Sequence, residues 1–188
     1  MGLFLGLDLS LTGSGVSVIN VNGEILWSKK LSCKVTGVER LRLLEMDLMS
    51  MLDMYSSQIQ LAAIESPAYG VKDGGGRLFE LGEWAGITKL NLHKLGIKFI
   101  MMAPTQLKKY ILGKSDSKSS STKDLIMLDI YKKWGIEIRD NNIADSYVLA
   151  RIARDYSHDP DGLESSQKEV LAKLKQSQKI IEAECVLV

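Results

Sequence analysis

The chain has 188 residues and a formal net charge of +1, and its length fits a single compact domain. Hydrophobic residues make up 45% of the sequence and charged residues 25%, which are ordinary globular values and exclude wholesale disorder and a fibre. No charge-free apolar run approaches the roughly 20 residues of a membrane-spanning helix. No basic segment precedes the short apolar run near the N-terminus, so we expect neither a membrane span nor a secretory signal.

Cysteine usage indicates a reducing compartment. The two cysteines, Cys33 and Cys185, lie far apart in the sequence and belong to no CxxC pair or Cys/His cluster. This spacing disfavours both a disulfide framework and a zinc site. We therefore expect a cytoplasmic protein.

Positive charge is concentrated in the middle of the chain. Residues 98–139 hold nine Lys or Arg against four Asp or Glu, whereas acids outnumber bases in residues 1–97 and in residues 140–188. A basic segment in an otherwise slightly acidic chain indicates a local binding surface for a polyanion. A solvated charged face explains the charge pattern alone equally well.

The first third of the chain is predicted to form strands. Gly2–Leu9 is an almost unbroken apolar run, typical of a strand buried on both faces. The turn signals Thr12–Gly15 and Asn22-Gly23 separate it from two further strands, Val16–Ile19 and Glu24–Leu31. Three strands joined by such short turns form an antiparallel meander.

Helices and strands alternate after the meander. Apolar residues at three- and four-residue spacing predict helices over Val38–Leu52 and Leu78–Leu92. Between these helices, Leu61–Ile64 is a short buried strand, followed by a glycine-rich loop at Val71–Gly76. Lys98–Met102 is the fifth predicted strand.

The last third of the chain is predicted to be helical around one polar, serine-rich loop. The helices are expected over Thr105–Ile111, Asp124–Trp134, Asn142–Tyr156 and Leu163–Glu184, with the loop at Gly113–Thr122. The order of elements predicts an α/β fold with a five-stranded mixed sheet, made of the meander and two parallel strands and flanked by helices. We place the main domain at residues 1–156 and a C-terminal helical extension at residues 157–188.

Three acids occupy positions where apolar residues are expected. Asp8 interrupts the most hydrophobic strand, and a carboxylate there costs several kcal/mol unless it is paired or metal-bound. Glu65 ends the next buried strand, and Asp145 lies in the first turn of the helix that begins near Asn142, on the same face as Asn142. Each acid alone has an ordinary explanation as a helix cap or a partner of a lysine. Strand ends in α/β sheets are where ligand sites gather, so together they indicate a site.

Converging acids favour a divalent cation. Two carboxylates about 4 Å apart repel by ~4 kcal/mol at an effective dielectric of 20, so three of them raise their pKa values or recruit a cation. Oxygen ligands without His or Cys favour Mg²⁺ or Mn²⁺. Such ions activate water and stabilise the leaving oxygen in phosphodiester hydrolysis, commonly as a pair ~4 Å apart. We expect a metal site of this kind, with no small-molecule cofactor.

The motifs together resemble a known family. Its first strand and turn are represented by Leu5–Ser10 and Thr12–Gly15, its second acid by Ala63-Ile64-Glu65, its next helix by Leu78–Gly86, the following segment by Ala103–Gly113, and its acidic helix by Asn142–Tyr147. The order and spacing of these motifs, over residues 2–155, are similar to those of RuvC-type Holliday junction resolvases of the ribonuclease H-like superfamily. The small size and the altered details look like a bacteriophage member, which would act in the cytoplasm of the bacterial host.

The resemblance implies a homodimer with two sites, which makes paired nicks in four-way and other branched DNA with Mg²⁺ or Mn²⁺. Carried over by position, Asp8, Glu65 and Asp145 would be catalytic metal ligands. The family has a further acid where this chain has Asn142, which can ligate through its carbonyl oxygen but brings no charge. Asp140 is close enough in sequence to substitute, and both assignments stay open.

The resemblance also implies residues that contact DNA. Lys108 matches a lysine near the scissile phosphate, a second catalytic lysine corresponds to Lys118 or Lys123, and Tyr69 lies near an aromatic position that stacks on bases, one residue out of register. The expected DNA contacts are Tyr69, Lys72, Lys108, Lys109, Lys114, Lys118 and Lys123. Gly82 and Gly86, four residues apart, would allow close helix contact across the dimer or tight packing within one subunit.

Three other functions fit parts of the sequence. A ribonuclease H-like nuclease acting on RNA–DNA hybrids or other branched DNA would use the same acids. A junction-binding protein that does not cleave is suggested by Asn142. An actin-like sugar kinase, suggested by Gly6-Leu7-Asp8 with Thr12-Gly13, needs a second domain that 188 residues do not hold.

Overall fold

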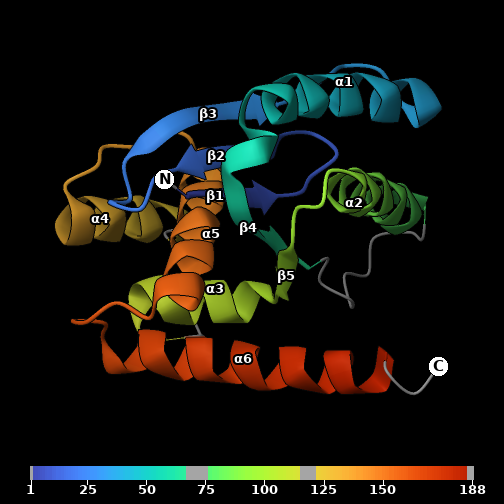
Figure 1. The fold of residues 1–188 in the computed structure, drawn as a ribbon. Coiled ribbons are helices and arrows are strands. Elements are labelled where there is room, and N and C mark those ends of the chain that lie inside the picture. The colour runs from blue at the N-terminus through green and yellow to red at the C-terminus, as the bar shows by residue number, and fades with distance from the viewer. Residues whose placement is uncertain (1, 67–75, 115–121, 186–188) are drawn as a thin grey trace.

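The computed structural model describes residues 2–66, 76–114 and 122–185, and side chains within these ranges except at 76–77, 122–123 and 178–185. Figure 1 shows a sheet with helices on both sides. The strands are β1 (Leu3–Asp8), β2 (Ser14–Ile19), β3 (Ile25–Leu31), β4 (Ile59–Glu65) and β5 (Phe99–Met102). The helices are α1 (Gly37–Tyr55), the 3-10 turn η1 (Ser56–Gln58), α2 (Gly76–Lys94), α3 (Pro104–Leu112), α4 (Thr122–Trp134), α5 (Asn141–His158) and α6 (Ser165–Cys185).

The sheet has the order β3-β2-β1-β4-β5. β1, β2 and β3 pair antiparallel, while β4 pairs parallel with β1 and β5 pairs parallel with β4. This confirms the predicted fold class, a meander extended by two parallel strands and flanked by helices. Among the elements of the described residues, η1 alone was not expected; it joins α1 to β4 at a segment too short to show apolar periodicity.

The two faces of the sheet pack against different helices. Odd-numbered residues of β1, such as Leu5 and Leu7, are buried in one hydrophobic cluster with residues of α1 and α2. Phe4 is buried in the other cluster, with residues of α3, α4, α5 and α6. Because side chains alternate along a strand, Gly6 and Asp8 point to this second face, where α5 lies.

Two glycines let α5 approach the sheet very closely. A Cβ atom on Gly6 would lie 1.9 Å from the carbonyl oxygen of Ser146, and one on Gly15 would lie 1.8 Å from that of Asn142. Beside them, the buried hydroxyls of Ser17 and Ser146 share a hydrogen bond of 2.7 Å. Any side chain at either glycine would push the helix outward, so these residues set the position of the first turns of α5.

The C-terminal helix α6 runs alongside α3 (Figure 1). Its residues Val170, Leu171 and Leu174 are buried in the same cluster as α5, and Lys109 of α3 forms an ion pair of 2.6 Å with Glu169. The helical extension predicted after residue 156 therefore contributes side chains to the core, and the domain boundary itself stays a prediction. Over the described ranges, we find no helix of sufficient length and apolar character to cross a membrane.

Candidate active site

Asp8 and Glu65 end neighbouring strands at the centre of the sheet. Strands β1 and β4 are parallel, with Gly6 opposite Ala63 and Leu7 opposite Ile64, so the next pair in this register is Asp8 and Glu65. Ala63 is buried in the cluster on the α5 side, and by alternation Glu65 points to that side too. Two carboxylates therefore lie side by side on one face of the sheet, at the carboxyl ends of parallel strands.

Helix α5 brings the third acid to this edge of the sheet. It begins at Asn141, and its N-cap residue Asp140 accepts hydrogen bonds from the backbone N–H groups of Asn142 (2.8 Å) and Ile143 (3.3 Å). Asp145 is the fifth residue of the helix and opens its second turn, so its expected place in the first turn was wrong by one residue. The close contact at Gly6 and Gly15 holds these turns of α5 against the ends of β1 and β2.

The carboxylates affect one another's protonation. Burial is the largest of the effects that together raise the pKa of Glu65 to about 9; the charge of the neighbouring Asp8, a hydrogen bond with Asp8 and the charge of Asp145 act in the same direction, while Lys108 acts to lower it. These effects favour the protonated form of Glu65 in its contact with Asp8. Asp8, Asp145 and Lys108 of α3 thus all lie near enough to Glu65 to affect its ionisation.

The donor set fits a divalent cation bound through few protein ligands. Among the described residues, no three His, Cys, Asp or Glu side chains are arranged to hold one metal ion. Mg²⁺ commonly binds through only one or two carboxylates and completes its coordination with water and substrate phosphate. The contact between Asp8 and Glu65 brings together two such carboxylates.

The two candidates for a fourth ligand differ in what their side chains do. The carboxylate of Asp140 caps α5 and forms an ion pair of 3.4 Å with Lys30. Burial acts to raise the pKa of Asp140, but the hydrogen bonds from Ile143, Asn142 and Lys30 outweigh it and lower that pKa. Asn142 lies against β2, with its side-chain Nδ2 3.4 Å from the position of a Cβ on Gly13. Asp140 is thus already engaged in the helix cap, and the choice between the two residues as a fourth ligand stays a prediction.

The predicted DNA contacts are only partly within the described residues. Lys108 lies beside the carboxylates, Lys109 is paired with Glu169, and Lys114 is exposed. The side chain of Lys123, in the first turn of α4, lies outside the described part. Tyr69, Lys72 and Lys118 also lie outside the described residues.

Ser14 is a residue of this region that the sequence did not reveal. Its buried hydroxyl donates to the carbonyl of Ser10 (2.7 Å) and accepts hydrogen bonds from the backbone N–H of Ser10 (3.0 Å) and from Nε1 of the buried Trp84 (3.0 Å). The contact ties the loop that follows Asp8 to helix α2. In the sequence, Ser14 is one of several small residues in a turn signal, and nothing there distinguishes it.

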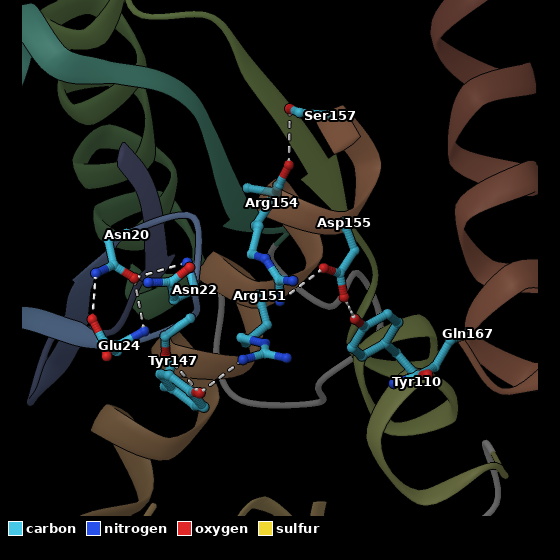
Figure 2. A network of polar contacts seen from close by, with 12 residues as sticks. Asn20, Asn22, Glu24, Tyr110, Tyr147, Arg151, Arg154, Asp155, Ser157 and Gln167 are labelled. Carbon is cyan, nitrogen blue, oxygen red and sulfur yellow. Dashed lines mark hydrogen bonds and ion pairs between the residues drawn. The ribbon is translucent and has the colours of Figure 1, made fainter. Parts of the chain in front are cut away.

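A second polar cluster lies further along α5 (Figure 2). The buried Tyr110 of α3 donates a short hydrogen bond to the buried Asp155, which also pairs with Arg154 at 3.2 Å. One helical turn away, Arg151 stacks on Trp134, with 4.4 Å from its Cζ to the ring centroid. Burial, followed by the Asp155 carboxylate, raises the pKa of Tyr110 well above its ordinary value. Oδ2 of Asp155 thus accepts the hydrogen bond from Tyr110, while its buried Oδ1 forms the ion pair with Arg154 but no hydrogen bond.

Solved structures share this fold. Thermus thermophilus RuvC superposes with a TM-score of 0.64 at 17% identity, over 79% of this chain and 90% of that one. T. thermophilus RuvC in complex with a Holliday junction substrate gives 0.67 at 17% identity, over 80% and 91%. The yeast mitochondrial Holliday junction resolvase Ydc2 gives 0.45 at 15% identity, over 95% and 82%. No protein-family model and no curated protein matches the chain. The chain therefore has the fold of RuvC, at an identity that shows the fold alone.

Proposed function

We propose that this chain is a divalent-cation-dependent endonuclease that resolves four-way and other branched DNA junctions. The observation that carries the proposal is the contact of Asp8 with Glu65, beside Asp145, at the ends of the central strands. The fold adds support, because RuvC has it and one of the similar structures holds a Holliday junction. A bacteriophage origin and a cytoplasmic location stay predictions.

The residues divide the work of phosphodiester hydrolysis as follows. Asp8 and Glu65 would hold Mg²⁺ or Mn²⁺, with Asp145 and the amide oxygen of Asn142 as further ligands for a second ion. When bound, such ions neutralise phosphate charge, activate water and stabilise the leaving oxygen. Lys108 lies close enough to act on Glu65 and would bind the phosphate at the same place.

We further propose that the enzyme is a homodimer that pairs through α2, giving two sites for paired cuts. A Cβ atom on Gly82 or Gly86 would meet nothing within 4 Å, so tight packing within one subunit does not explain these glycines. Phe79 and Leu90, on the same side of the helix, are 76% and 52% exposed. Two glycines four residues apart, flanked by exposed apolar side chains, form a surface on which a second copy of α2 can pack closely.

The proposal is tested by comparing cleavage rates on a four-way DNA junction, a linear duplex and an RNA–DNA hybrid. We expect the junction to be cut fastest, with cleavage lost in EDTA and restored by Mg²⁺ or Mn²⁺. The matched variant Glu65→Gln should lower the cleavage rate at least ~100-fold, since a metal ligand supplies several kcal/mol of transition-state stabilisation, and should still bind the junction.

Other results would favour a different function or contradict the role of Glu65. Fastest cleavage of the hybrid would favour a nuclease of the ribonuclease H type. Junction binding without cleavage at any concentration of Mg²⁺ or Mn²⁺ would favour a non-cleaving binding protein, the function suggested by Asn142. Equal loss of binding and cleavage in Glu65→Gln would contradict the assignment of Glu65 as a ligand.

A further inference from the structure

We propose that Lys30 binds a DNA phosphate next to the candidate active site, on the side of the carboxylates opposite Lys108. This inference rests on the proposed function and adds a substrate contact to the same site. Lys30 belongs to the meander, far in sequence from the basic segment at residues 98–139, and none of the expected DNA contacts lies on β3.

The strand register places Lys30 in one row with the carboxylates. Lys30 of β3 pairs with Gly15 of β2, and Gly15 pairs with Asp8 of β1. Glu65 follows on β4 and pairs with Met102 of β5. With neighbouring strands about 4.8 Å apart, the backbone of Lys30 lies about 10 Å from that of Asp8. The row has the acids at its centre, a lysine at one end, and α3 with Lys108 just beyond the other.

The side chain of Lys30 points to the face that holds the acids. A Cβ on Gly15 would strike the carbonyl of Asn142, so this pairing row faces α5. Lys30 shares that face, because its Cε and Nζ lie 2.4 Å and 3.3 Å from the position of a Cβ on Gly13, and Asn142 Nδ2 lies 3.4 Å from the same position. The ammonium group is therefore a near neighbour of the Asn142 amide, in space that a side chain at residue 13 would fill.

A DNA phosphate can replace Asp140 as the ion-pair partner of Lys30. The ion pair with Asp140 has an N–O distance of 3.4 Å, and the two side chains are 42% and 41% exposed. Pairs so exposed contribute little to stability. Asp140 also keeps its helix-capping bonds when Lys30 leaves. A phosphate that follows the DNA backbone past the carboxylates thus meets an ammonium group that is accessible and weakly held.

Lys29 is a matched control on the adjacent position. It points to the other face of the sheet, where it pairs with Asp47 of α1 at 2.9 Å, and these side chains are 47% and 41% exposed. The two lysines therefore agree in charge, strand, exposure and type of partner. They differ in which face of the sheet they occupy.

The experiment measures junction binding by Lys30→Gln and Lys29→Gln over a range of salt concentrations. Both are made in the Glu65→Gln background, so that the four-way junction is not cut. We expect Lys30→Gln to bind more weakly and to reduce the slope of log affinity against log salt by about one, the value for one phosphate contact. Lys29→Gln should leave the slope unchanged, and thermal unfolding should show that both variants are folded.

The possible failures are distinct. If the Glu65→Gln protein binds the junction and the two lysine variants have the same slope as that protein, the role of Lys30 is overturned and the proposed function stands. If the protein with both lysines binds no branched DNA, the proposed function is overturned and the role of Lys30 with it.

Discussion

Helix α5 carries two acids in opposite surroundings. Near its N-terminus, Asp145 lies beside Asp8 and Glu65, so that like charges are brought together. Near its C-terminus, the buried Asp155 accepts a hydrogen bond from Tyr110 and pairs with Arg154. The first cluster places two further carboxylates near Glu65, opposed by Lys108, whereas the second places a hydroxyl and a guanidinium against Asp155.

The difference separates a candidate site from a structural network. Acids that raise one another's pKa destabilise the metal-free fold, and such a cluster is useful only if a cation from outside binds there. A buried acid that accepts a hydrogen bond from Tyr110 and pairs with Arg154 joins α3 to α5. Burial of an acid alone therefore does not identify a site; the two clusters differ in whether further carboxylates lie beside the buried acid.

The largest expected effect on stability comes from the cluster around Asp155. Asp155→Ala leaves the hydroxyl of Tyr110 and the guanidinium of Arg154 without their partner, and breaking a buried pair in this way costs about 3–5 kcal/mol. Urea denaturation should show this loss in the free energy of unfolding. The control Asp47→Ala removes an exposed partner of Lys29 and should cost at most ~1 kcal/mol. Equal losses in both variants would remove the distinction between the two clusters.

A smaller loss is expected where α5 meets the sheet. In Gly6→Ala the new Cβ would lie 1.9 Å from the carbonyl of Ser146, and overpacking of this kind costs about 1–3 kcal/mol. Cleavage should fall as well, since the helix that carries Asp145 has to move. Gly82→Ala is the control: its Cβ meets nothing within 4 Å, and at concentrations where the chain is monomeric it should gain up to ~1 kcal/mol of helix stability. A stable Gly6→Ala protein would show that the close contact is not required.

The smallest expected change in the free energy of unfolding, taken per pH unit, is the pH dependence of the metal-free protein. The pKa of Glu65 rises from its ordinary 4.5 to about 9 on folding, so between these values the folded state holds a proton that the unfolded state has released. Stability should therefore decrease as pH rises through this window, by at most about 1.4 kcal/mol per pH unit. Denaturation in EDTA should show this slope in the wild type and a flatter one in Glu65→Gln. Equal slopes would mean that burial and the neighbouring carboxylates do not raise the pKa of Glu65.

Most of the fold could be predicted, whereas the networks around α5 could not. The five strands and the helices could be predicted from apolar runs, as at Gly2–Leu9, and from the spacing of apolar residues. A buried strand or helix face requires apolar residues at regular positions, and these positions can be read from the sequence. The contact of Tyr110 with Asp155 corresponds to no pattern in the sequence, because the two residues are 45 positions apart. Asp140 was considered as a metal ligand from its position alone, and its capping bonds appeared only with the observed start of α5 at Asn141.

By itself, the sequence determined the order of the elements and the presence of acids in apolar strands, because both depend on neighbours along the chain. Only the tertiary structure decided which charges meet. Strand register places Lys30 and Asp8 in one row across the sheet. Because Gly6 and Gly15 have no Cβ atom, α5 can pack closely against the sheet and bring Asp145 towards that row. Pairing and close packing join residues that the chain keeps far apart, and one step in register would turn Lys30 to the other face.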